Sequence, residues 1–208
     1  MYPKYSKEEI LAVSNVLKSG KVSSWSGNLC KKFEQKFSKY HDLKYGVAVS
    51  NGSVALEIAL KALDLPKKSE IIVTPRSFVI SASCVLNLGY KAVFADVDDL
   101  GNLSAKSVIK KINNNTKAII LVHIDGNPIE MDEYKKIIKN KNIKIIEDCS
   151  QSHGAIYKNK KVGSFGDISI WSFCNDKIIS TGGEGGMICT NNVKYYKKCW
   201  SIKDHGKN

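Results

Sequence analysis

Hydrophobic positions along the chain follow two different spacings. Leu29, Phe33 and Phe37 recur at every fourth residue, which is typical of an amphipathic helix. An earlier helix is predicted over residues 6–17, because Ser6 and Glu9 have the spacing of a capping box. From residue 45 onward, short apolar runs of strand length alternate with helical patterns.

This alternation extends over most of the chain and predicts its fold class. The pattern predicts helices at 53–63, 78–88, 105–112, 131–138 and 193–200, and strands or hairpins at 45–49, 70–73, 92–95, 118–122, 143–146, 155–162, 168–173 and 187–190. Such alternation favours an α/β fold with a mainly parallel central sheet and helices on both faces. Ligands of such sheets bind at the carboxyl ends of the strands.

Composition places the chain among ordinary globular proteins. Its 208 residues suit one domain or a domain with a fragment of a second, and 43% are hydrophobic and 25% charged. No apolar run approaches membrane-spanning length and the N-terminus lacks a signal-peptide core, so we expect a cytoplasmic protein without a membrane partner. The six cysteines are scattered, which predicts reduced thiols and no metal site.

The formal net charge of +12 raises the question of nucleic-acid binding. Arg76 is the only arginine, although arginine is the preferred fork for phosphates and base edges. The lysines are spread along the chain as solvated positions rather than gathered in one segment. We therefore expect no nucleic-acid partner, while an anionic small substrate remains compatible with the charge.

Gly52 and Ser53 follow a predicted strand and open a predicted helix. A helix N-terminus offers free N–H groups and the positive end of the helix dipole, so it can bind an anion. Ser53 would add a hydroxyl group. The simpler alternative is an ordinary strand-to-helix turn that Ser53 caps.

Glu147 and Asp148 follow the buried strand of residues 144–146. Two adjacent carboxylates at that place are costly unless they are paired. A protonated ring nitrogen would pair with one of them, as pyridoxal phosphate chemistry requires. In the alternative interpretation, one carboxylate caps a turn and the other is solvated.

Lys177 lies between an apolar strand and the glycine-rich residues 182–186, five positions after Ser172. An enzyme that forms a Schiff base needs a lysine, a hydroxyl group for a phosphate, and backbone that leaves room for a flat ring. Phe78, after another strand end, would stack on that ring. The simpler alternatives are that Lys177 is one solvated lysine among many and that Phe78 is a core residue.

Together these segments resemble the DegT/DnrJ/StrS-type sugar aminotransferases, which use pyridoxal 5′-phosphate and have the fold-type I architecture. The resembling segments cover nearly the whole chain in the expected order: 50–56, 74–78, 94–98, 122–128, 147–155, 163–167, 172–177 and 183–186. The resemblance implies the large domain of a fold-type I PLP-transferase over residues 1–208, with a helical segment at 1–44 and without the C-terminal small domain.

The resemblance also implies roles for single residues. Lys177 would bond to the cofactor aldehyde and move the proton during catalysis, and Asp148 would pair with the pyridine nitrogen. Gln151 would contact the ring hydroxyl side, while Phe78 would stack on the face opposite the lysine. His153 would lie behind the residues that touch the cofactor. The phosphate would be held by Gly52, Ser53 and Ser172.

The implied reaction is transamination of a nucleotide-linked keto-deoxy sugar, with glutamate as amino donor, for surface polysaccharide or lipopolysaccharide synthesis. A homodimer is implied as well. Members with a histidine in place of the lysine dehydrate sugars, so Lys177 favours transamination over the alternative of a sugar dehydratase. Members are nearly twice as long as this chain, which keeps open an inactive remnant that acts as a dimerising or regulatory module.

Overall fold

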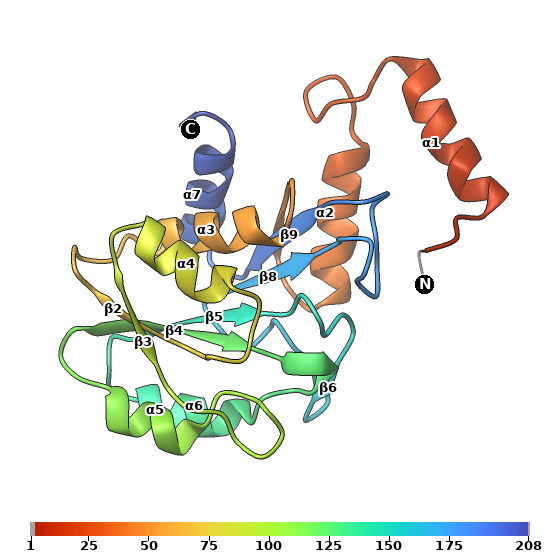
Figure 1. The fold of residues 1–208 in the computed structure, drawn as a ribbon. Helices are drawn as coiled ribbons and strands as arrows, with labels where there is room; N and C mark the ends of the chain where they lie inside the picture. The colour runs from red at the N-terminus through yellow and green to blue at the C-terminus, as the bar shows by residue number, and fades with distance from the viewer. Residues whose placement is uncertain (1–2, 208) are drawn as a thin grey trace.

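A seven-stranded sheet forms the centre of the computed structural model, which describes residues 3–207 (Figure 1). In spatial order its strands are β1 (Tyr45–Val49), β9 (Gly186–Thr190), β8 (Ile168–Ser172), β5 (Lys144–Asp148), β4 (Thr116–Val122), β2 (Glu70–Val73) and β3 (Lys91–Phe94). Strand β9 runs antiparallel to both of its neighbours, and the other pairs are parallel. The mainly parallel sheet expected from the sequence is confirmed.

Helices cover both faces of this sheet (Figure 1). One face carries α2 (Leu29–Tyr40), α5 (Ala105–Lys111) and α6 (Met131–Ile138), and the other carries α3 (Gly52–Ala62), α4 (Ile80–Asn87) and α7 (Val193–Lys203). The remaining elements are α1 (Lys7–Ser19), η1 (Ile124–Gly126), β6 (Ile156–Tyr157) and β7 (Lys160–Lys161). Helix α1 begins with the predicted capping box, has no buried residue and stands away from the sheet.

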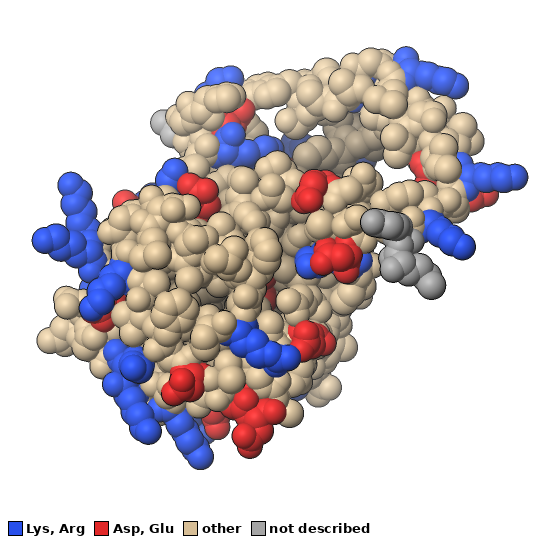
Figure 2. All heavy atoms as spheres, in the orientation of Figure 1, with Lys and Arg blue, Asp and Glu red and all other residues tan. Residues whose placement is uncertain are grey.

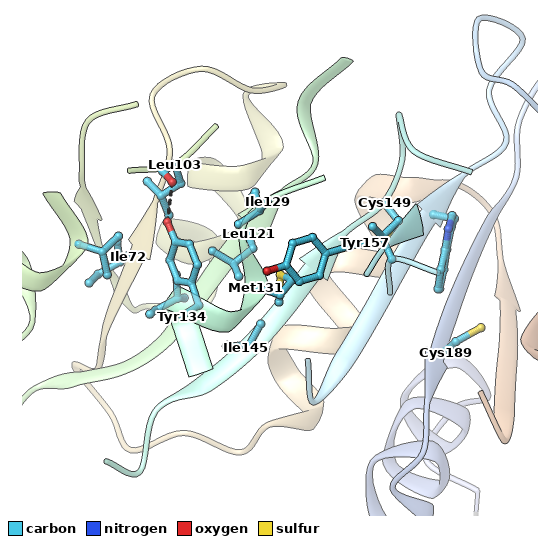
Figure 3. Close-up of a cluster of buried hydrophobic side chains, with 14 of the residues drawn as sticks. Ile72, Leu103, Leu121, Ile129, Met131, Tyr134, Ile145, Cys149, Tyr157 and Cys189 are labelled. Atoms are coloured by element: carbon cyan, nitrogen blue, oxygen red, sulfur yellow. Dashed lines mark hydrogen bonds between the residues drawn. The ribbon is translucent and has the colours of Figure 1, made fainter. Parts of the chain in front are cut away.

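The two faces are built from alternate residues of the same strands. In β4, Leu121 packs toward α5 and α6, while Ile120 packs toward α3 and α4. Figure 3 shows the first of these clusters, in which the hydroxyl group of Tyr134 donates a hydrogen bond to the carbonyl of Leu103. A strand that is apolar on both faces must be covered on both, which explains the three layers.

Two predicted boundaries are wrong in ways that matter for function. The helix predicted at 78–88 begins at Ile80, so Phe78 precedes it in a turn where its carbonyl accepts from Ser81 N. The strand predicted to end at residue 146 continues through Glu147 and Asp148. Its backbone pairs in register with β4 as far as Asp148, and this tertiary pairing outweighs the low strand propensity of acidic residues.

Lysine side chains are distributed around the face seen in Figure 2 and do not form one continuous basic patch. All six cysteines are free thiols. Within residues 3–207, no helix has the length and apolar character needed to cross a membrane.

His41 is a buried ionisable group at the C-terminal end of α2. Its ring is 0% exposed and packs against Phe37 and Trp171, with 4.7 Å between ring centroids in both cases. Burial lowers the pKa of His41 from 6.5 to about 4, and the neighbouring His153 acts in the same direction. The folded protein therefore holds this ring neutral over a pH range in which the unfolded chain would protonate it.

This difference predicts a loss of stability in acid. As the pH falls from about 6.5 to about 4, the unfolded chain takes up a proton at His41 that the folded chain does not, so the free energy of unfolding decreases. The loss is at most about 3 kcal/mol. In urea denaturation at a series of pH values, His41→Phe should flatten this dependence. His205→Asn, at an exposed position whose left-handed backbone asparagine tolerates, serves as control. An unchanged slope in His41→Phe would contradict the assignment.

Candidate active site

The carboxyl ends of the parallel strands meet at one edge of the sheet and border a cavity of about 530 Å³. The seven residues singled out from the sequence all line this cavity: Gly52, Ser53, Phe78, Asp148, Gln151, Ser172 and Lys177. They follow or end four different strands, β1, β2, β5 and β8. The structure thus brings together residues that are up to 125 positions apart in the sequence, counting from Gly52 to Lys177.

The N-terminus of α3 points its first N–H groups at the cavity. Asn51 is the cap, since its side chain accepts from Val54 N at 2.9 Å, so the alternative in which Ser53 caps the helix is wrong. Among residues 3–207, the N–H groups of Gly52 and Ser53 have no hydrogen-bond acceptor. Free N–H groups at the positive end of a helix dipole form an anion site.

Ser172 is held beside this helix end by close backbone packing. Gly186 in β9 pairs with Val49 of β1 on one side and with Ser172 of β8 on the other. A Cβ atom on Gly52 would lie 2.8 Å from the Cβ atom of Ser172, so only glycine permits this approach. Ser53 and Ser172 therefore both line the cavity next to these free N–H groups, and the hydroxyl oxygen of Ser172 accepts from Cys174 N at 3.3 Å.

Asp148 is the last residue of β5 and forms the floor of the cavity, with 6% of its surface exposed. Burial raises its pKa, although a hydrogen bond from Ser150 N at 3.0 Å acts in the opposite direction. No basic side chain among residues 3–207 forms an ion pair with it. The protein thus supplies a buried carboxylate without a cationic partner of its own.

Glu147 points to the opposite face of the sheet and is 0% exposed. Its carboxylate accepts from His123 Nε2 at 3.0 Å, from Gly163 N at 2.8 Å and from Phe165 N at 2.8 Å, with a further bond from the next N–H in the loop. Burial would raise the pKa of Glu147, but these hydrogen bonds hold it below its ordinary value. The alternative interpretation, in which one of the two carboxylates is solvated, is wrong.

Sequence reasoning assigned no role to His123, the partner of Glu147. The only signal in the sequence is that His123 directly follows the predicted strand 118–122. In the structure, Leu121 pairs with Glu147, so His123, two residues further on, faces the same side of the sheet as Glu147. Because Ile129 N donates to His123 Nδ1 at 3.1 Å, the ring proton is on Nε2 and is donated to Glu147. Ligand atoms of His123, Glu147 and Cys149 lie within 4.8 Å of one another. Both histidine nitrogens are engaged and burial raises the pKa of the Cys149 thiol, so this cluster does not suit a metal ion.

Lys177 lies in the loop between β8 and β9 and reaches the cavity from the side of Ser172. A turn holds its backbone, since Lys177 N donates to Cys174 O at 3.0 Å. Its Nζ is 2.9 Å from the Asp176 carboxylate, and its side chain is only 22% exposed. The alternative of a freely solvated lysine is therefore wrong.

Phe78 and Gln151 complete the wall of the cavity. The ring of Phe78 is 69% exposed, so the alternative in which it is a core residue is wrong. Gln151 Oε1 accepts a hydrogen bond from Asp125 N at 2.7 Å. His153 is not among the cavity-lining residues; its ring packs against Phe173 with 5.7 Å between centroids, and burial lowers its pKa to about 4.

Comparisons with known proteins agree with this geometry. The model of the DegT/DnrJ/EryC1/StrS aminotransferase family matches residues 3–208. GDP-perosamine synthase of Escherichia coli O157:H7 is 39% identical over 98% of this chain and 56% of its own length. The aminotransferase structure from Psychrobacter cryohalolentis is 46% identical with a TM-score of 0.98, over 100% of this chain and 53% of that one.

A third similarity concerns a structure that contains a cofactor. The E. coli GDP-4-keto-6-deoxy-D-mannose-3-dehydratase with bound hydrated PLP is 32% identical with a TM-score of 0.91, over 99% of this chain and 55% of that one. The chain thus spans about half the length of the relatives that it matches.

The two adjacent carboxylates predict opposite effects on stability. Asp148→Asn should raise the free energy of unfolding at pH 7, because it removes an unpaired buried charge, and the gain should shrink as acid protonates Asp148 in the unmodified chain. Glu147→Gln should lower the free energy of unfolding by about 3 kcal/mol, because the NH2 group of the amide would then face N–H donors that need an acceptor. Urea denaturation of the two variants measures both effects. A change of the same sign in both would contradict this account.

Proposed function

Because the chain belongs to the DegT/DnrJ/EryC1/StrS aminotransferase family, we propose that it binds pyridoxal 5′-phosphate in this cavity and transfers an amino group to a nucleotide-linked keto-deoxy sugar. The observation that supports this most strongly is the convergence of all seven expected residues on one cavity. Each of these residues has the chemical group that one part of this cofactor needs as a partner.

The residues of the cavity fit the chemical groups of pyridoxal phosphate. Its phosphate is an anion and suits the free N–H groups and hydroxyls around Ser53. Its ring nitrogen, when protonated, is the cation that the buried Asp148 lacks. Phe78 offers an exposed aromatic face for the flat ring, and Gln151 an amide for the ring hydroxyl side.

When bound, pyridoxal phosphate supplies an electrophilic aldehyde and a ring that accepts electrons. Asp148 would keep a proton on the ring nitrogen, and because Asp148 is buried, this ion pair would be stronger than in water. Lys177 Nζ provides the amine that bonds to an aldehyde and that moves a proton once it is released. The carboxylate of Asp176, 2.9 Å from Nζ, holds the end of the Lys177 side chain in place.

The substrate and partners are proposed from the relatives. GDP-perosamine synthase, by its name, makes a nucleotide-linked amino sugar. We propose a substrate of this class for the present chain, glutamate as donor, a role in surface polysaccharide synthesis, and a cytoplasmic homodimer. The net charge of +12 suits an anionic nucleotide sugar.

Sugar dehydration is the second candidate, because one similar structure is a dehydratase with bound PLP. The identity of residue 177 favours transamination. Lysine can bond covalently to the aldehyde, whereas a histidine, which marks the dehydrating members of the family, cannot. Lys177 is therefore the residue on which the choice between the two reactions depends.

Covalent attachment of the cofactor to Lys177 is the first expected outcome. Addition of pyridoxal phosphate to the chain, followed by borohydride reduction, should add the reduced cofactor to the peptide that contains Lys177, as measured by mass spectrometry. Lys177→Ala and Lys177→Arg should abolish this label, and the arginine variant retains the positive charge beside Asp176.

Lys158→Ala is the control, because Lys158 also forms an ion pair with a carboxylate, that of Asp132 at 2.7 Å, but is more exposed and does not line the cavity. It should label as fully as the unmodified chain. Labelling that is spread over many lysines, or that persists in Lys177→Arg, would refute specific binding.

Transamination is the second expected outcome. The chain with pyridoxal phosphate, ¹⁵N-glutamate and GDP-, dTDP- or UDP-linked keto-deoxy sugars should yield a ¹⁵N-labelled amino sugar, detected by mass spectrometry. Formation of a deoxygenated sugar without nitrogen would favour the dehydratase instead. Cofactor attachment without any turnover would contradict catalysis by this chain and favour a non-catalytic module.

A further inference from the structure

The orientation of the Gln151 amide is determined by its hydrogen bond. Asp125 N lies 2.7 Å from Gln151 Oε1, and a backbone N–H can only donate, so the oxygen of the amide must face Asp125. The Nε2 group has no acceptor among residues 3–207, and the residue lines the cavity. Gln151 therefore presents a hydrogen-bond donor to a ligand, and its acceptor is already engaged.

Asp125 holds this orientation from an unusual backbone conformation. Its φ of 53° and ψ of 24° are left-handed, which is uncommon for any residue other than glycine. Its carboxylate lies 2.9 Å from Arg76 Nη2. The ion pair thus connects the turn that contains Asp125 to the segment that follows β2.

Arg76, the only arginine of the chain, is fixed at two further points. Its Nη1 donates to Leu100 O at 3.4 Å, and its guanidinium lies so close to Gly101 that a Cβ atom there would collide with it. The side chains of Arg76 and Asp125 are 50% and 69% exposed, so the pair contributes little to stability. A planar fork that joins two loops is better suited to fixing geometry than to stabilising the fold.

We infer that the Arg76–Asp125 ion pair is a positioning device, which fixes the Asp125 N–H so that Gln151 donates to the ring oxygen of bound pyridoxal phosphate. This inference rests on the proposed function. A donor at that oxygen favours its ionised form. Loss of the ion pair should therefore loosen the cofactor and move the ionisation of the bound ring to higher pH.

The test measures the dissociation constant of pyridoxal phosphate and the pH midpoint of its visible absorbance. Asp125→Asn removes the charge but tolerates the left-handed backbone, and Arg76→Lys keeps the charge but not the fork. Each should weaken binding about three- to tenfold and raise the midpoint. Gln151→Glu keeps the acceptor for Asp125 N but removes the donor, so it should raise the midpoint further.

A double variant distinguishes an ion pair that acts through Gln151 from one that affects the cofactor independently of Gln151. In a Gln151→Ala background, Asp125→Asn should have no additional effect on either readout, because the ion pair acts only through Gln151. Lys158→Ala, which breaks an exposed ion pair away from the cavity, should leave both readouts unchanged. The other charged groups around the cavity are the same in every variant: Asp148, Asp176, Lys177 and Glu184.

Two results would overturn the inference. If Asp125→Asn and Arg76→Lys leave the midpoint unchanged while the unmodified chain binds the cofactor, the ion pair does not position Gln151, although the proposed function stands. If the effects of Asp125→Asn and Gln151→Ala add in the double variant, the ion pair does not act through Gln151 either, and again the proposed function stands. If the unmodified chain binds no cofactor, both the inference and the proposed function fail.

Discussion

The arrangement of the site depends on one buried carboxylate, that of Glu147. Glu147 is the next-to-last residue of the central strand β5. It accepts hydrogen bonds from His123 and from three N–H groups of the loop 163–166. A buried charge is tolerated only when its hydrogen-bonding capacity is used to this extent. By satisfying Glu147 completely, the protein ties β4, β5 and the loop before β8 into one rigid unit.

Strand geometry then determines where the next residue points. Successive side chains of a strand face opposite sides of the sheet, so Glu147 faces α5 and α6 with Ile145, while Asp148 faces α3 with Ile146. The two carboxylates therefore have opposite functions although they are neighbours in the sequence. One holds the scaffold together, and the other is left unpaired beside the anion site of α3.

The sequence predicted the parallel layers, because periodicity is a local property. The seven residues singled out for the cavity came from their places near strand ends together with the resemblance to the family. It did not predict the role of His123, because that role depends on the register between β4 and β5, which no local pattern specifies. The same limit explains why the sequence left open an alternative in which one of the two adjacent carboxylates is solvated. Asn51, rather than Ser53, caps α3 for a similar reason: both residues are good caps, and tertiary packing selects between them.

The charges of the cavity define the ligand more narrowly than any single residue does. Asp148 is a buried carboxylate that lacks a cation, and the N-terminus of α3 carries N–H groups that lack an anion. A ligand with only one of these charges would leave either the buried Asp148 or the helix N–H groups without a partner. A flat ring with an anionic group on one side and a protonated nitrogen on another satisfies both. The cavity by itself therefore holds a carboxylate without a cation and N–H groups without an anion. Binding of such a ligand would offset the free energy that the burial of Asp148 costs.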